Sequence, residues 1–307
     1  MNDHIHPTIM SRRYLTFAIL GVISLAIWGR ALLATFSLAV GNGEYTHILL
    51  ILPVGAALIF VRHDRPPASP RPGFLAGSGL LLLAVLTTTC SKWAYAATHA
   101  DVALSLSMLA LVTWWIGSIV LCFGIQVFRS LLFPLLFLFW LVPLPAFILD
   151  RIVALLQHGS ALLTRSLFAT AGVPVSLNGV VLSIPGLDIE VAKECSSIRS
   201  SLMLMVASMV LAQLFLRSPW RKAAVVIAAV PLSVAKNAAR IFTLSTLATH
   251  VDPSFLTGRL HHEGGVVFFL LALGAICLMI WVLLRTEAER RFSQVPLGAA
   301  RSPVADR

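Results

Sequence analysis

Long apolar segments constrain the fold of this chain more than any other feature. About eight segments are apolar enough to form helices that cross a bilayer, whose roughly 30 Å hydrocarbon core takes about 20 residues to span. Of the 307 residues, 58% are hydrophobic and 12% are charged, and the mean hydropathy is +0.89. Soluble domains carry about 25% charged residues. The sequence therefore predicts an all-α polytopic membrane protein.

The predicted spans set the expected domain organisation. They cover residues 14–33, 48–61, 74–89, 102–123, 131–149, 198–216, 223–247 and 266–284. Residues 1–13 form a short N-terminal segment, and residues 14–285 form the membrane domain. Residues 286–307 are rich in Pro, Gly, Ala and Ser, and we expect this tail to be disordered. No cleavable signal is evident, so we expect the first apolar segment to remain as a span.

Basic residues predict the orientation of the spans. Lys and Arg collect at Arg12-Arg13, in loop 62–71, at Arg129, in loop 217–222 and after residue 284. Loops 41–47 and 91–101 contain only Lys92 as a basic residue. An excess of Lys and Arg in short loops marks the cytoplasmic side, so we expect both termini to be cytoplasmic. The formal net charge of +10 reflects these loops. Since no basic patch is interleaved with aromatic residues, we expect no nucleic-acid partner.

The longest segment on the predicted outer side is residues 150–195. Residues 151–168 have apolar residues at helical spacing and few charges, which is typical of a helix at the membrane interface. Residues 175–192 alternate in polarity around Asn178-Gly179, which predicts a small β-hairpin. The hairpin leads to Cys195, just before the sixth span.

The four cysteines differ in their surroundings. Cys122 and Cys277 lie inside apolar segments and are expected in the core, while Cys90 ends a span. No CxxC spacing or His/Cys cluster is present, so we expect neither a metal nor an organic cofactor. Only Cys195 has ionisable neighbours on both sides. It is either a nucleophile or a small buried apolar residue, which is how an isolated cysteine usually packs.

Three kinds of polar group are predicted to lie at one membrane depth. Cys195 precedes the sixth span, and His261-His262 precede the eighth. The seventh span contains Lys236, Asn237 and Arg240, whose spacing places them on one helix face. Arg240 follows Lys222 by 18 residues, which at 1.5 Å per residue is roughly 27 Å, close to the outer boundary.

These groups suit acyl transfer through a thioester. Nearby cations favour the reactive thiolate, histidine moves protons, and arginine offers fixed donors to a developing oxyanion. Each group also has a structural interpretation. Arg240 can be a snorkelling anchor, the histidines plain interfacial residues, and Gly264-Gly265 a site of close helix packing.

Three short blocks carry a family resemblance. They are Cys195-Ser-Ser-Ile-Arg-Ser200, Asn237-Ala-Ala-Arg240-Ile and His261-His-Glu-Gly-Gly265-Val-Val-Phe. In this order they resemble the Cys-Ser-Gly-x-x-Ser, Asn-x-x-Arg and His-x-x-x-Gly blocks of the exosortases, which are related to the archaeosortases. Tyr45-Thr-His47 is similar to that family's first outer loop, and residues 133–137 and 142–145 are similar to its fifth span. The resemblance covers most of residues 40–285.

Two departures from the family pattern affect the site. Ser197 stands where the family usually has glycine, so the turn after the nucleophile differs. Two histidines are adjacent, and His261 has the spacing to Gly265 that the family block requires, with His262 as the alternative.

The resemblance implies a membrane cysteine peptidase and transpeptidase-like sorting enzyme of the cell inner membrane, with its site on the outer, periplasmic face. Its substrates would be exported proteins ending in a Pro-Glu-Pro type motif, a hydrophobic helix and a basic tail. Cys195 would be the nucleophile, Arg240 the proton or hydrogen-bond donor, and His261 the base or transition-state stabiliser. Ser196, Asn237 and Gly265 would support them. The family's link to exopolysaccharide production implies a glycan or lipid acceptor.

Three rival functions remain open. A transporter would use Arg240 and Lys236 to bind an anion, but it requires polar residues near the midplane of several spans. A non-catalytic assembly factor for polysaccharide export would tolerate Cys195→Ser. A protease that only hydrolyses would add no new group to the product's C-terminus.

Overall fold

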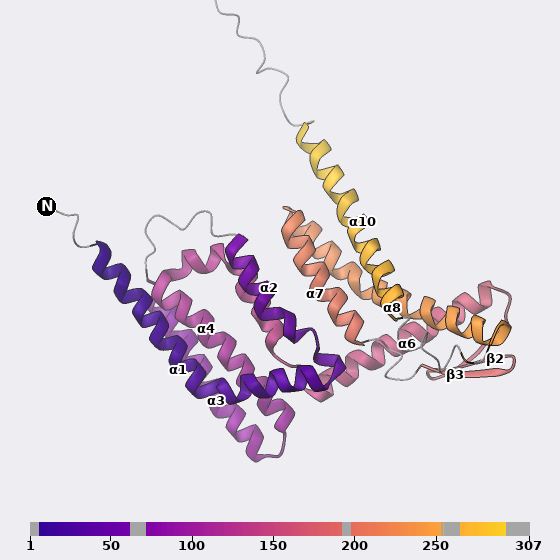
Figure 1. Cartoon of the computed structure of the whole chain (residues 1–307), viewed down its shortest axis with the longest axis horizontal. Coiled ribbons are helices and arrows are strands. Elements are labelled where there is room, and N and C mark those ends of the chain that lie inside the picture. Colours follow the sequence, from indigo (N-terminus) through magenta and orange to yellow (C-terminus); the bar gives the residue numbers. More distant parts are fainter. Residues whose placement is uncertain (1–5, 62–71, 192–197, 253, 255–264, 293–307) are drawn as a thin grey trace, which may run out of the picture. The chain divides into compact units, whose positions relative to one another are not determined.

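Two compact units make up the chain. The computed structural model describes residues 6–61, 72–191, 198–252, 254 and 265–292, and for residues 6–11 and 288–292 only the backbone. The first unit is Met1–Ile152 and the second is Val153–Arg307. Figure 1 shows the helical elements of both, coloured along the sequence.

Helices dominate the described residues. In the first unit they are α1 (His6–Gly41), η1 (Gly43–Tyr45), α2 (Ile48–Val61), α3 (Phe74–Ala96), α4 (Ala100–Ser130), α5 (Leu132–Phe137) and η2 (Leu138–Leu141). Helix α6 (Ala146–Thr170) leads into the second unit, which contains α7 (Ile198–Phe215), α8 (Pro219–His250) and α10 (Gly265–Phe292). Eight helical segments of the described chain are long and apolar enough to cross a membrane. This confirms the predicted class.

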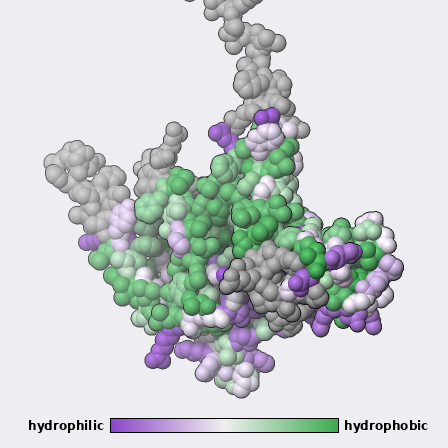
Figure 2. Space-filling model, turned by 45° about the vertical axis from the view of Figure 1, so that its right-hand side comes forward, coloured by the Kyte–Doolittle hydropathy of each residue, from purple (hydrophilic) through white to green (hydrophobic). Residues whose placement is uncertain are grey.

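Apolar side chains cover much of the described surface, as Figure 2 shows for one face. Leu75 is 88% exposed and Phe60 is 81% exposed, on α3 and α2 respectively. A soluble protein would bury such side chains, whereas lipid solvates them. The exposed apolar residues are therefore those expected of a multi-pass membrane protein.

The fifth predicted span is not one continuous helix, so this boundary prediction was wrong. Residues 131–149 are divided into α5, η2, a non-helical stretch at 142–145 and the first turn of α6. Pro143 and Pro145 cannot donate backbone hydrogen bonds, which ends the helix. Helix α6 instead meets the criteria of length and hydropathy for a candidate span, although its segment has the pattern expected of an interfacial helix.

Side chains from other elements satisfy the backbone where this helix breaks. The Tyr45 hydroxyl donates to the carbonyl oxygen of Leu144 at 2.9 Å, and the Ser105 hydroxyl donates to that of Pro143 at 2.7 Å. The Asp101 carboxylate accepts from the amide of Ala146 at 2.9 Å. Non-helical backbone at membrane depth requires such partners. Because α4 leads away from Asp101 and residues 131–145 return to it, a broken helix brings the chain back toward the start of α4.

Removing one of these donors should destabilise the first unit. Tyr45→Phe keeps the ring but leaves the Leu144 carbonyl without its donor, so we expect a loss of about 1–3 kcal/mol in the free energy of unfolding. Tyr95→Phe is the matched control, because Tyr95 is exposed. The measurement is the midpoint of SDS-induced unfolding in mixed micelles. Equal midpoints for the two variants would contradict the assigned hydrogen bond.

In the second unit, α6 supports a small sheet. Strands β1 (Ser176–Asn178), β2 (Val181–Ile184) and β3 (Leu187–Glu190) pair antiparallel in the order β1-β2-β3. Asn178 pairs with Val181 across a tight turn, in which Gly179 has φ +63°, a left-handed conformation that favours glycine. The predicted hairpin is confirmed, and β3 extends it.

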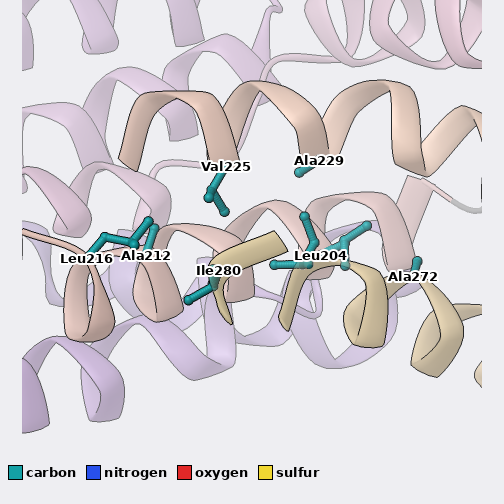
Figure 3. Packing of buried hydrophobic residues seen from close by; sticks show 8 residues of the cluster. Leu204, Ala212, Leu216, Val225, Ala229, Ala272 and Ile280 are labelled. Carbon is teal, nitrogen blue, oxygen red and sulfur yellow. The ribbon is translucent and has the colours of Figure 1, made fainter. Parts of the chain in front are cut away.

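A three-helix bundle forms the rest of the second unit. Buried side chains of α7, α8 and α10 share one apolar cluster, drawn in Figure 3. Its members are Leu204, Ala212, Leu216, Val225, Ala229, Ala272, Ile276 and Ile280. At one end of the bundle, Arg221 of α8 donates to the carbonyl of Leu283 and pairs with Glu287 of α10 at 3.6 Å. Lys222 of α8 donates to Gln213 of α7 near the same end, whereas the hydrogen bond between Lys236 and Ser200 lies toward the other end of α8.

Two details differ from the sequence predictions. Cys277 is exposed rather than in the core, because α10 turns this face outward, whereas Cys122 is buried as predicted. Helix α10 continues to Phe292, so the first residues of the tail predicted to be disordered are helical. Residues 293–307 lie outside the described chain.

Candidate functional site

The candidate site is built around residues 236–241 of α8. The guanidinium group of Arg240 lies beside the first residue of α10: a β-carbon on Gly265 would be 3.9 Å from its Cζ and Nη1 atoms. This distance is an ordinary van der Waals contact, so Arg240 of α8 lies against the first turn of α10. Arg240 and Gly265 are 25 residues apart in the sequence but lie in contact. This agrees with the prediction that Arg240 lies near the start of the eighth span.

One turn earlier on α8, Lys236 contacts α7. Its amino group donates a short hydrogen bond to the Ser200 hydroxyl, and its side chain is only 6% exposed. Arg240 is close enough to repel it electrostatically. Two cationic side chains thus lie together at the start of α7 and α10, one of them almost completely buried.

Asn237 points to a different neighbour. It is 1% exposed, and its Nδ2 donates to the Ser160 hydroxyl of α6 at 3.0 Å. Successive helical residues are about 100° apart, so Asn237 faces α6 while Lys236 faces α7. That Lys236, Asn237 and Arg240 share one face stays a prediction, and the contact of Asn237 with Ser160 holds α8 against α6.

Small and aromatic residues hold α6 beside this part of α8. A β-carbon on Gly159 would lie 3.3 Å from Val234, and the rings of Phe168 and Phe242 are 4.9 Å apart. Close approach through small residues is typical of membrane helices. These α6 contacts were not predicted, because the sequence does not reveal which helices are neighbours.

The sheet brings the chain to the same place. Val191 follows β3, and its carbonyl accepts from the Gln157 side chain of α6 at 2.8 Å. Val191 is buried in one apolar cluster with Ala161, Leu182 and Ile241. Ile241 is the residue after Arg240. The last described residue before segment 192–197 is thus anchored beside Ile241 of α8.

Four predicted site residues, Cys195, Ser196, His261 and the alternative His262, lie outside the described residues. The ends of their segments are described. Segment 192–197 lies between Val191, clustered with Ile241, and α7, whose Ser200 contacts Lys236. Segment 255–264 ends at Gly265, beside Arg240. The flanks of both segments therefore meet at residues 236–241.

Comparison with protein families identifies the family of the chain. A family model described as transmembrane exosortase matches residues 40–278, well over half of the chain. The chain belongs to the transmembrane exosortase family. Searches among curated proteins and among solved structures found no match. The matched range covers most of each unit and contains all residues of the candidate site.

The exosortase-like blocks of the first unit also contact one another. Tyr45, from the first block, donates to Leu144 in the stretch 142–145. His47 packs edge-on against Trp140, with ring centroids 5.9 Å apart. Both Tyr45 and His47 are buried. These contacts give the first block a structural role beside the broken helix at residues 132–145.

The described parts of the chain were searched for side chains that could bind a metal ion together. No group of three or more His, Cys, Asp and Glu side chains there could hold a metal ion. The chemistry available at residues 236–241 is instead that of fixed cationic donors. Such donors can bind an anion or stabilise a negative charge that develops during a reaction.

Proposed function

We propose that this exosortase family member cleaves the C-terminal sorting signal of exported proteins through Cys195. The observation that supports it is the convergence on α8: the flanks of the Cys195 segment and of the His261 segment both meet residues 236–241. A cationic side chain near a cysteine favours its thiolate. Arg240 would supply this charge and would donate to the oxyanion of a tetrahedral intermediate.

The reaction has two steps. The Cys195 sulfur attacks the carbonyl carbon of the scissile peptide bond, so that an S–C bond forms and the C–N bond breaks. His261 delivers a proton to the leaving amine. An acceptor hydroxyl or amine of a glycan or lipid carrier then attacks the thioester carbonyl: a C–O or C–N bond forms, the C–S bond breaks, and His261 transfers the acceptor's proton to the released sulfur, which restores the thiol. Substrates are proteins with a Pro-Glu-Pro type motif, a hydrophobic helix and a basic tail, linked to exopolysaccharide production.

The proposed location is the cell inner membrane, with the site at the outer face and both termini in the cytoplasm. A substrate tail inserted in the membrane would present its motif at this depth. The basic residues near Arg217, Arg221 and Lys222 lie at the opposite end of α8 from Arg240, which supports this orientation through the excess of basic residues on the cytoplasmic side.

Cys195→Ala tests this function directly. We expect the variant to abolish processing of a co-expressed reporter that carries such a signal, because alanine cannot form the thioester. The measurement is an immunoblot that separates the membrane-held precursor from the product. Cys277→Ala is the matched control, because Cys277 is an exposed cysteine of the same unit. Normal processing by a stably inserted Cys195→Ala protein would overturn the proposal.

Two further measurements separate the alternatives. Cys195→Ser should also fail to process the reporter, whereas a non-catalytic assembly factor would tolerate it. The mass of the product's C-terminus distinguishes transfer from hydrolysis, since only transfer adds a new group.

A further inference from the structure

We propose that Lys236 and Ser200 form a binding site for a carboxylate side chain of the protein substrate. The inference rests on the proposed function, because it assumes that a protein chain enters the site beside Arg240. It assigns the Lys236–Ser200 pair to substrate specificity, separate from the bond-breaking step.

The first argument is the burial of a cation. Lys236 is 6% exposed, and α8 belongs to a membrane protein. Intramembrane lysines are costly and usually functional. Removing an ammonium group from water requires compensation by hydrogen bonds and opposite charge. The other lysine of α8, Lys222, lies near the opposite end of the helix, and its amino group donates to the side chain of Gln213. Of the two lysines of α8, Lys236 is therefore the one whose buried position requires a functional explanation.

The second argument is the composition of its surroundings. Lys236 donates a hydrogen bond to the neutral Ser200 hydroxyl. The side chain of Arg240, which lies close enough to repel it, is also positively charged. Among the described residues, the ion pair of the bundle involves Arg221 and Glu287 at the opposite end. A like-charged neighbour raises the cost of the buried ammonium charge, so an incoming anion beside Lys236 would lower that cost.

Depth favours a peptide carboxylate over a lipid phosphate. Lys236 precedes Arg240 by one helical turn, or about 6 Å along α8, on the side of the apolar cluster formed by Leu204, Ala229 and Ala272. A lipid phosphate remains at the interface, whereas a substrate chain that continues into the membrane passes this level. A carboxylate on a side chain near the scissile bond can reach Lys236 while the bond itself remains beside Arg240.

Ser200 gives the site its geometry. It lies in the first turn of α7, and its hydroxyl fixes the Lys236 amino group at the α7–α8 contact. The amino group has three donors, so one can hold Ser200 while others bind the incoming carboxylate. An amide in place of the carboxylate would lose the charge interaction but keep its shape.

The experiment compares two reporters in cells. One ends in a Pro-Glu-Pro type motif, a hydrophobic helix and a basic tail, and the other has that Glu changed to Gln. With the wild-type enzyme, we expect the acidic reporter to be processed roughly 10- to 100-fold faster, the range for a hydrogen bond to a charged group. With Lys236→Met, we expect both reporters to be processed at similar slow rates. Lys222→Met is the matched control and should retain the wild-type ratio.

Two additional variants distinguish a loss of the carboxylate site from misfolding of the enzyme. Lys236→Glu should restore processing of a reporter whose Glu is changed to Lys, which a merely unfolded variant would not do. Ser200→Ala should reduce the ratio between the acidic and amide reporters while processing continues. If Lys236→Met processes both reporters but keeps the wild-type ratio, the carboxylate site is wrong and a phosphate or an internal carboxylate is the partner. That result would leave the proposed function intact, whereas processing by Cys195→Ala would overturn the function itself.

Discussion

Arg240→Gln is expected to lower reporter processing by about 10²- to 10³-fold, the effect of removing a donor to an oxyanion. Arg240 lies beside Gly265, and the next residue, Ile241, shares an apolar cluster with Val191, which precedes the Cys195 segment. Glutamine keeps hydrogen-bonding atoms but removes the charge that favours the Cys195 thiolate. The initial rate of product formation, normalised to enzyme abundance in the membrane, measures the effect.

Two controls show whether the charge or the shape of Arg240 matters. Arg240→Lys retains the positive charge but loses the planar fork of donors, so we expect an intermediate rate. Arg165→Gln removes an exposed arginine from α6 of the same unit and should process at the wild-type rate. A rate for Arg240→Gln within threefold of wild type, at equal abundance, would show that Arg240 is only a membrane anchor.

Hydropathy was sufficient to predict the class of this protein, because every membrane span requires a long apolar helix. It was not sufficient for residues 131–149, where apolar composition continues through a break. The groups that permit this break are Tyr45, Ser105 and Asp101, which come from other parts of the chain. A sequence window cannot contain such partners, so a broken helix and a continuous one have the same hydropathy.

The closeness of Arg240 to the start of the eighth span was predictable, but the helix neighbours of the site were not. Counting residues along α8 correctly placed Arg240 near the start of the eighth span, and Gly265 is found beside it. Helical spacing alone also suggested that Asn237 faces the same way. Spacing along one helix does not show the hydrogen bond of Asn237 to Ser160 of α6, because this contact depends on how the two helices pack. Ser200 as the partner of Lys236 depends on the same information.

The close contact between α3 and α4 provides the largest expected effect on folding. A β-carbon on Gly77 would lie 2.6 Å from the backbone Cα and N of Leu121 and 2.7 Å from its Cβ. Backbone atoms cannot rotate away as the end of a side chain can. Gly117, on the other helix, would place a β-carbon 3.0 Å from Cβ of Leu80. Glycines on both helices therefore permit this approach, as in other membrane helix pairs.

Gly77→Ala should separate the two helices and lower the free energy of unfolding by about 1–3 kcal/mol, the usual cost of overpacking. Gly77→Leu should prevent the first unit from folding. The matched control is Gly79→Ala, on the same helix, where a β-carbon would meet nothing within 4 Å. This control should be neutral or stabilising, because alanine favours the helix over glycine by about 1 kcal/mol.

The midpoint of SDS-induced unfolding in mixed micelles separates these variants. Gly77→Ala should unfold at a lower SDS fraction than wild type, and Gly79→Ala at an equal or higher one. If both alanine variants unfold together, α3 and α4 do not approach as closely as their glycines permit. A lower midpoint for Gly77→Ala with unchanged processing per folded molecule would show that this contact supports the fold alone, since the residues proposed for chemistry belong to the second unit.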